Sequence, residues 1–167
     1  MEPGQSQIVQ VTAGALAHAL PGDLTLGVLA ESQSQDYVRD EDAWAVTITE
    51  YQAVEVAWLP EAQTVSGTLS ASFMLIVTNT GNVNTTYAIS VLSTPEAAAQ
   101  LAVTSLPIPP RTAATLPVVV EAPGGGVYTL EGRAVFGDVQ ASDTATLTVI
   151  GEEQPPYQLI YLPVILR

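Results

Sequence analysis

The stretch LSASFMLIVTNTGNVNTTYAISV, residues 69–91, decides the fold class of this chain. Apolar side chains occupy every second position in residues 69–77, which is the period of a β-strand with one buried face. Apolar groups also appear on the other face near the end, so we expect this strand to be the longest and central in its sheet. Residues 79–82 predict a turn in which Gly81 is free to take a positive φ, and residues 87–91 predict the returning strand.

The sequence before and after this pair of strands continues the pattern. Residues 54–58 alternate Val, Val and Trp with Glu and Ala, and Pro60 ends the run, which predicts an edge strand at the start of the domain. Residues 93–100, STPEAAAQ, are the one piece with helical character. Because they are too few for a stable isolated helix, we expect a single helical turn that bridges two sheets.

Three more strands follow towards the carboxyl end. Residues 115–120 predict a strand whose Pro117 lacks a backbone donor, which suits an edge or the start of a strand. Residues 127–135 and 145–149 predict the last two strands, joined by a polar loop at 137–143. Short strands at regular spacing, with no alternation of strands and helices, indicate an all-β protein, an antiparallel sandwich of two sheets and seven strands.

The same periodicity predicts the core of this sandwich. The expected members are the inward residues of the strands: Phe73, Leu75, Val77, Tyr87, Ile89, Val91, Leu116, Val118, Tyr128, Leu130, Ala134, Leu147 and Val149.

An incomplete internal repeat organises the rest of the chain. Residues 3–50 follow the same course as residues 109–151: a Pro-led turn, a Val-rich strand, a Gly turn, a "TL" strand, an acidic loop and a final alternating strand. We therefore expect a partial unit of three strands in residues 1–50, at residues 7–13, 24–31 and 43–49. We expect a complete sandwich in residues 51–150, and a Pro-containing linker with an apolar strand in residues 151–167. A longer tandem array is the favoured origin, with Met1 added to a trimmed piece.

Composition excludes several classes of partner. The chain has 17 acidic residues, four arginines and no lysine, and its net charge is −13. A field of this sign repels nucleic acids and anionic membranes, and no window has the roughly 20 unbroken apolar residues of a membrane-spanning helix. Cysteine is absent, so disulfides and thiolate metal sites are excluded. An acidic, Thr-, Val- and Ala-rich chain suits a bacterial surface protein better than a cytosolic enzyme.

Three runs of the sequence resemble a known family. FMLIVTNTGNVNTTYAISV at 73–91, IPPRTAATLPVVVEAP at 108–123 and GGVYTLEGRAVF at 125–136 resemble the bacterial immunoglobulin-like modules of the CARDB type and related domains appended to secreted glycosidases. The resemblance covers residues 51–150 and, as a partial second copy, residues 3–50. It implies an immunoglobulin-like sandwich that acts as a spacer, an adhesion unit or an accessory domain. The family shares no catalytic residues, so none is transferred.

The partial unit and the tail raise the question of what covers them. The inward side chains of the partial unit would lie exposed unless another strand packs on them, and an open apolar face promotes association. The tail YQLIYLPVILR has high strand propensity, although Pro163 restricts it to an edge or a bulge. It either folds back onto its own partial unit or enters that of a neighbouring copy. The candidate assembly residues are Tyr157, Leu159, Ile160, Tyr161, Leu162, Val164, Ile165 and Leu166.

The strongest polar cluster is an acidic run near residue 40. Asp36, Asp40, Glu41 and Asp42 are a candidate Ca²⁺ site, because hard cations bind several loop oxygens. Their spacing matches no EF-hand, and Arg39 lies inside the run. A solvated acidic loop is therefore the favoured interpretation.

Other single residues carry less chemistry. His18, the sole histidine, has no visible partner for general base catalysis and is expected to be a loop residue without a role. Asn84 opens an N-x-T sequon, which is expected to be chance. Trp44 and Trp58 suit either a carbohydrate-stacking platform or packing, and packing is favoured because a buried Trp removes so much area from water.

These observations lead to one functional hypothesis and one rival. We expect a non-catalytic extracellular or cell-surface module without a cofactor, a spacer, adhesion or filament-forming element whose partners are other copies of itself or further sandwich domains. The rival is an accessory carbohydrate- or protein-binding domain of a secreted bacterial hydrolase.

Overall fold

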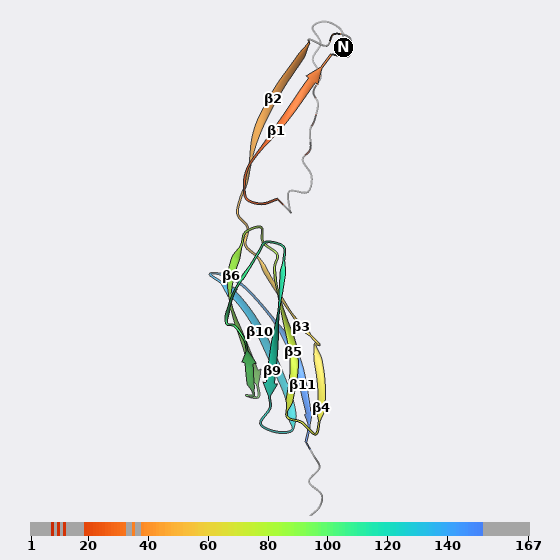
Figure 1. Ribbon diagram of the computed structural model, residues 1–167, viewed down its shortest axis with the longest axis vertical. Helices are drawn as coiled ribbons and strands as arrows, with labels where there is room; N and C mark the ends of the chain where they lie inside the picture. The colour runs from red at the N-terminus through yellow and green to blue at the C-terminus, as the bar shows by residue number, and fades with distance from the viewer. Residues whose placement is uncertain are drawn as a thin grey trace, which may run out of the picture.

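The computed structural model describes residues 8, 10, 12, 19–32, 35 and 38–151. All regular structure in these residues is β-strand, which confirms the all-β prediction. None of the described segments forms a helix with the length and apolarity needed to cross a membrane. Figure 1 shows a hairpin of β1 (Gly22–Glu31) and β2 (Arg39–Ile48), followed along the molecule by a sandwich that contains the remaining strands.

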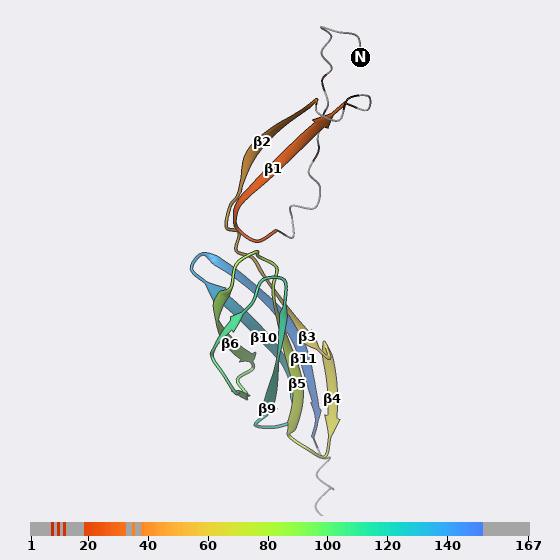
Figure 2. The same ribbon diagram turned by 45° about the horizontal axis from the view of Figure 1, so that its top comes forward.

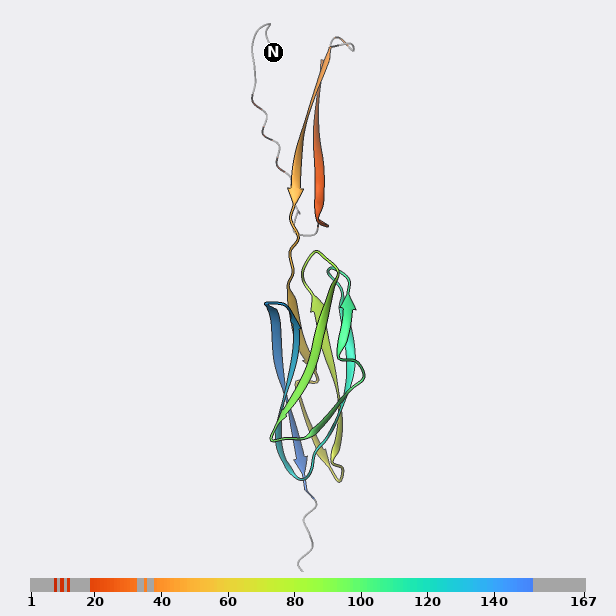
Figure 3. The same cartoon turned by 90° about the vertical axis from the view of Figure 1, so that its left-hand side faces the viewer.

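The sandwich consists of two sheets packed face to face, seen edge-on in Figure 3. The first sheet has the order β3-β5-β9-β7, with the bounds Val54–Leu59, Ser70–Asn79, Ala113–Glu121 and Ala98–Leu101. The second has the order β4-β11-β10-β6-β8, with the bounds Ala62–Ser66, Val139–Ile150, Gly126–Phe136, Thr85–Thr94 and Ser105–Ile108.

This strand order is that of an immunoglobulin-like sandwich. The first sheet follows the A-B-E-D order of such domains, and β11-β10-β6 follow the G-F-C order of the opposite sheet. Tyr128, near the start of β10, donates its hydroxyl hydrogen bond to the carbonyl oxygen of Gly124 at 2.9 Å, the arrangement known as a tyrosine corner. The topology therefore confirms the fold class predicted from the alternating strands.

The first strand of the sandwich changes sheets. β3 forms the edge of the first sheet, as predicted, and after Leu59 and Pro60 the chain continues as β4 in the second sheet. β4 pairs with β11 in parallel, with residues 62–66 opposite residues 146–150. The sandwich is thus antiparallel except at this one pair, and it has five plus four strands where the sequence predicted seven.

The core lies between the two sheets and consists almost wholly of the predicted side chains. All of them are buried except Val91, which is partly buried against the cluster. Trp58 and Phe73 meet edge to face, with ring centroids 5.9 Å apart and planes at 81°. Trp58, for which packing was favoured, is also in the core, together with members that were not predicted: Ala71, Ile108, Val120, Ala122 and Ala145.

The predicted helical turn at residues 93–100 is wrong. β6 continues to Thr94, and β7 then pairs its residues 98–101 with residues 118–121 of β9. Alanine favours helix by less than about 1 kcal/mol per residue over most residue types. Pairing with an existing sheet outweighs that preference.

The predicted polar loop at residues 137–143 is also wrong. Gly137, at φ 56°, and Asp138 alone form the turn, and β11 already begins at Val139. The polar residues of this stretch lie on an alternating strand that starts beyond the edge of the core. β11 is consequently the longest strand, and β5, although central as predicted, is shorter.

Pro117 occupies neither an edge strand nor a strand start. β9 lies between β5 and β7, and Pro117 is opposite Met74 of β5. β7 pairs only as far as Val118, so Pro117 has a ladder neighbour on one side only. The missing donor is tolerated because one side of the strand is unpaired at this residue.

Candidate assembly surface

The hairpin β10–β11 provides an internal reference for the hairpin β1–β2. Its inward side chains are almost completely buried by the opposite sheet; they are Tyr128, Leu130, Ala134, Ala145, Leu147 and Val149. Asp143 lies beyond Ala145 on the same face, opposite Gly132. The backbone N–H of Trp58 donates to Asp143 Oδ2 at 3.2 Å, and the indole Nε1–H donates to the Asp143 carbonyl oxygen at 3.0 Å. β3 is thereby joined to β11.

β1 and β2 repeat the register of this reference hairpin. Gly22 begins β1 opposite Ile48, as Gly126 begins β10 opposite Val149, and both glycines have positive φ, 141° and 156°. Val28 of β1 is paired with Asp42 of β2, and this pair lies as far from Gly22–Ile48 as the pair Gly132–Asp143 lies from Gly126–Val149. The predicted strands at 24–31 and 43–49 therefore form, and each begins a few residues earlier than predicted. The third predicted strand, at 7–13, falls largely outside the described residues.

The inward face of β1–β2, meaning the face that corresponds to the buried face of β10–β11, is only partly covered by other residues. Trp44 is 52% exposed and Leu24 38% exposed, whereas their counterparts in the reference hairpin, Ala145 and Tyr128, are 1% and 4% exposed. Leu26, Val28, Val46 and Ile48 are half-buried. Among the described residues β1 and β2 form a sheet of their own.

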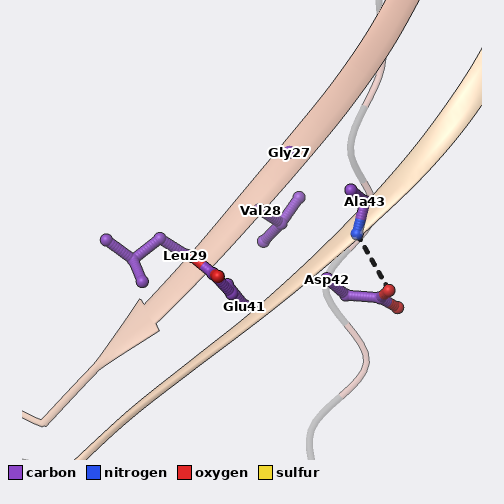
Figure 4. A pocket seen from close by; sticks show the side chains of 6 residues that line it. All are labelled: Gly27, Val28, Leu29, Glu41, Asp42 and Ala43. Carbon is purple, nitrogen blue, oxygen red and sulfur yellow. Dashed lines mark hydrogen bonds between the residues drawn. The ribbon is translucent and has the colours of Figure 1, made fainter.

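A shallow hollow of about 610 Å³ lies at the middle of the hairpin, at three consecutive register pairs. Figure 4 shows Val28 between the two strands, and Leu29 and Asp42 on opposite sides. The pair of small residues Gly27 and Ala43 is next to Val28 and Asp42, and the backbone N–H of Ala43 donates to Asp42 Oδ1 at 2.8 Å. The hollow is apolar on β1 and carries two carboxylates, those of Glu41 and Asp42, on β2.

The candidate Ca²⁺ residues do not converge in the described part of the chain. Asp40 and Asp42 share one face of β2, and Glu41 lies on the other because side chains alternate along a strand. Asp40 Oδ1 accepts a hydrogen bond from the backbone N–H of Glu41 at 3.0 Å. Asp36 lies outside the described residues. In the described ranges, no three His, Cys, Asp or Glu side chains group closely enough to hold a metal ion.

Asn82 joins the hairpin to the sandwich. Its Oδ1 accepts a hydrogen bond from the backbone N–H of Tyr51 at 2.6 Å, and its Nδ2 donates to the carbonyl oxygens of Thr49 at 3.0 Å and Ala19 at 3.4 Å. The Asn82 backbone N–H donates to the Tyr51 carbonyl oxygen at 2.8 Å. One side chain, 7% exposed, therefore holds both chain segments that flank the hairpin.

Gly81, beside Asn82, is needed for its small size and not for a positive φ. It does not have the positive φ that the sequence suggested. A Cβ atom at this position would lie 2.5 Å from the Tyr51 carbonyl oxygen and 3.0 Å from the backbone nitrogen of Ala53. The turn packs directly on the segment that enters β3.

The remaining sequence candidates are distributed as follows. Trp58 is a core residue, whereas Trp44 is half exposed on the hairpin. Asn84 is exposed before β6. His18 and the assembly residues Tyr157–Leu166 lie outside the described residues, so their roles stay predictions.

Comparison with known proteins reveals structural matches at low identity. No protein-family model and no curated protein sequence matches the chain. Domains 4 and 5 of the S-layer protein SbsC match with a TM-score of 0.48 and 17% identity, over 78% of this chain and 59% of that one. The C-terminal part of α2-macroglobulin from Escherichia coli, from domain MG7 onward, matches with a TM-score of 0.46 and 13% identity, over 60% of this chain and 17% of that one. The chain thus spans less than two thirds of the length of both.

A CARDB domain is also among the matched structures. This domain, of the PF1109 protein from Pyrococcus furiosus in complex with di-metal ions, matches with a TM-score of 0.44 and 15% identity, over 62% of this chain and 96% of that one. The link to domains appended to secreted glycosidases stays a prediction.

Sequence reasoning missed the three residues that define these contacts: Asn82, Gly132 and Asp143. Asp143 was assigned to a solvent-facing loop and Gly132 to an ordinary strand. The repeat itself held a usable signal, because aligning the last strands of the two copies, Ile48 with Val149, places Asp42 beside Asp143. Asn82 had no such signal, since its partners come from segments distant in sequence.

Proposed function

We propose that this chain is a non-catalytic, extracellular or cell-surface immunoglobulin-like module that acts as a spacer, adhesion or filament-forming element. It associates with other copies of itself or with further sandwich domains by accepting an additional strand on the β1–β2 hairpin. One observation carries the proposal: the hairpin has the register of β10–β11, but its apolar inward face is half exposed. In β10–β11 the same face is covered by β3, β5 and β9.

The composition supports a cell-surface setting. A chain with a net charge of −13 is kept soluble by repulsion between copies. Because it has no cysteine, an oxidising environment outside the cell cannot form unwanted disulfides in it. A partly exposed apolar sheet face of this kind is a common mark of a protein–protein contact. Strand addition extends backbone hydrogen bonding along a sheet edge and gives affinity without a dedicated pocket.

Light scattering over a concentration series tests this function. The unmodified chain is expected to increase in mean mass with concentration, and Leu26→Thr, on the inward face of β1, is expected to weaken that increase. The matched control is Leu29→Thr, because Leu29 is apolar, on the same strand and on the opposite face. A chain that is monomeric at every concentration, or equal effects of the two substitutions, would contradict assembly through this face.

The half-exposed indole of Trp44 supports a second candidate function. An exposed aromatic ring stacks on apolar sugar faces, so the hairpin would serve as an accessory carbohydrate-binding surface of a secreted hydrolase. Binding to a glycan array that is lost in Trp44→Ala would favour this function. Association without glycan binding would favour the assembly module.

A further inference from the structure

The way β3 and β4 cover β11 indicates which kind of segment the corresponding β1–β2 hairpin could bind. β3 crosses the inward face with Trp58 bonded to Asp143, and β4 then continues as the parallel neighbour of residues 146–150. Trp58 also contacts the space that a Cβ at Gly132 would occupy. The cover is thus one continuous segment with an aromatic residue, a Leu-Pro bend and a short edge strand.

The β1–β2 hairpin corresponds to the part of this arrangement that is covered, namely β10 and β11. Asp42 takes the place of Asp143 in the register, and residues 45–47 take the place of residues 146–148. Asp42 is exposed, and the inward residues beside it are apolar and half-buried. A strand that supplied a backbone N–H to Asp42 would complete the contact seen at Asp143.

The tail of the chain has the sequence of the covering half. Residues 157–163, YQLIYLP, follow the same pattern of residue types as residues 54–60, VEVAWLP, with an identical Leu-Pro at the end. Both carry large apolar groups at the first, third and fifth positions, a polar residue at the second, and an aromatic-Leu-Pro end. The inward positions of β3 are those first, third and fifth residues, of which Trp58 is buried and the others are half-buried. Tyr161 therefore corresponds to Trp58.

We propose that the β1–β2 hairpin binds residues 157–167 of a second copy of the chain, with Tyr161 lying over Asp42 as Trp58 lies over Asp143. This inference rests on the proposed function and names the surface and the segment that perform it. The Tyr161 backbone N–H donates to the Asp42 carboxylate, a bond that needs no indole. Residues after Pro163 continue as a parallel edge strand along β2.

Side-chain size and charge agree with this pairing. The bulky Trp58 lies over Gly132, which has no side chain, whereas the smaller Tyr161 would lie over Val28, which has one. In this alignment Arg167 corresponds to Thr64 of β4, which is paired with Thr148 of β11. Thr148 in turn corresponds to Thr47 of β2, so Arg167 would lie beside Thr47. Thr47 donates its hydroxyl hydrogen bond to Asp23 at 2.7 Å, so the cation of the tail would arrive beside a carboxylate.

The tail cannot reach the hairpin of its own chain. β11 ends at Ile150, paired with Ser66 just before β5 begins, and the hairpin is attached at the other end of β5, as Figure 2 also shows. β5 spans about 30 Å at ~3.4 Å per residue, and Asp42 lies roughly 20 Å further, beyond Ile48 on β2. A fully extended segment from Gly151 to Tyr161 covers at most about 36 Å. The hairpin is therefore filled by another molecule.

Contacts of this kind join unlike surfaces, the tail of one copy and the hairpin of the next. Such a heterologous contact extends into an open head-to-tail row, unless two copies exchange tails reciprocally or the rotation between copies closes a ring. The row would repeat the arrangement of β3 and β4 on β11 at every junction.

Cross-linking between single cysteines tests the inference, because the natural chain has none. Asp42→Cys and Tyr161→Cys are prepared separately, mixed at concentrations where the unmodified chain associates, and treated with a short bifunctional thiol reagent. A cross-linked heterodimer is expected on a denaturing gel. The control mixture pairs Tyr161→Cys with Glu41→Cys, whose side chain is on the opposite face of β2, and is expected to lose this product.

Three results would overturn the inference. These are equal cross-linking by Glu41→Cys, cross-linking within one molecule when both cysteines are placed in the same dilute chain, and association by light scattering without any Asp42–Tyr161 product. The last result would leave the proposed function intact and assign the association to a different contact. A chain that never associates would instead contradict both.

Discussion

Asp143 holds the first strand of the sandwich through Trp58: its carboxylate accepts the backbone N–H of Trp58 at 3.2 Å, and its own carbonyl oxygen accepts the indole N–H at 3.0 Å. We expect Asp143→Ala to lower the free energy of unfolding by about 1–3 kcal/mol, because it leaves a partly buried N–H without an acceptor. Asp143→Asn keeps an acceptor oxygen and should lose less. Urea denaturation followed by Trp fluorescence measures both. Asp138→Ala, in the exposed turn of the same hairpin, is the control, and an equal loss there would contradict the assignment.

Gly132 has no room for a side chain. A Cβ atom would collide with Leu75 Cδ1 and lie 3.0 Å from Trp58 Cζ2, and the Leu75 side chain is fully buried. We expect Gly132→Ala to destabilise the sandwich by about 1–3 kcal/mol through overpacking. Gly27→Ala is the matched control, because nothing lies within 4 Å of its added methyl group. Thermal unfolding of the two variants should separate them, and equal melting temperatures would count against the packing argument.

Asn82 fixes the start of the sandwich relative to the hairpin. Asn82→Ala removes the acceptor of the Tyr51 N–H and the donor to the Thr49 carbonyl oxygen. We expect a loss of about 1–2 kcal/mol in unfolding free energy, and faster proteolysis between the hairpin and β3, because net hydrogen bonds contribute about 1 kcal/mol each. Limited proteolysis with mass spectrometry locates the cut. The exposed neighbour Asn84→Ala should show neither effect, and cleavage unchanged from wild type in Asn82→Ala would refute the prediction.

Tyr87 makes the free energy of unfolding depend on pH in the alkaline range. Burial raises the pKa of its phenol above the ordinary 10.0, and a hydrogen bond with the Thr85 side chain acts in the opposite direction. Because the folded state holds the proton more tightly, this contribution is complete below about pH 10 and is lost as the pH rises through the folded pKa. Tyr87→Phe also loses the bond from the hydroxyl to the Ala53 carbonyl oxygen at 3.0 Å. Unfolding midpoints from pH 8 to 11 should fall less steeply in the variant, and parallel curves would exclude this source.

Alternation was sufficient to predict the strands that make both layers of the core. In β5 and β10 every second side chain is buried, so the fold class and most of the core follow from the period alone. β8 was missed because Pro107 and Pro109 suggest a turn, although Ile108 between them is buried. β4 was missed because its sequence, AQTVS, has little apolar alternation, and its parallel pairing with β11 depends on contacts distant in sequence.

The candidate surface was predicted in outline, but its detail was not. The repeat indicated a partial unit with an open apolar face, and the strands of the hairpin followed from their pattern. Asp42 was recognised from sequence as one of several acidic residues, and its position opposite Val28 depends on cross-strand register. Register is set by pairing across the seven residues between β1 and β2, which no local propensity encodes.

The parallel pairing of β4 with β11 determines how the sandwich would carry a tensile load. The chain enters β3 at one end of the sandwich and leaves β11 at the other, while β4 and β11 run side by side in the same direction. A pull on these two points slides β4 lengthwise against β11, so the bonds between residues 62–66 and 146–150 are loaded together in shear and do not open one at a time. The hydrogen bonds between Trp58 and Asp143 also join β3 to β11, so the same pull would load them together with the β4–β11 pairing.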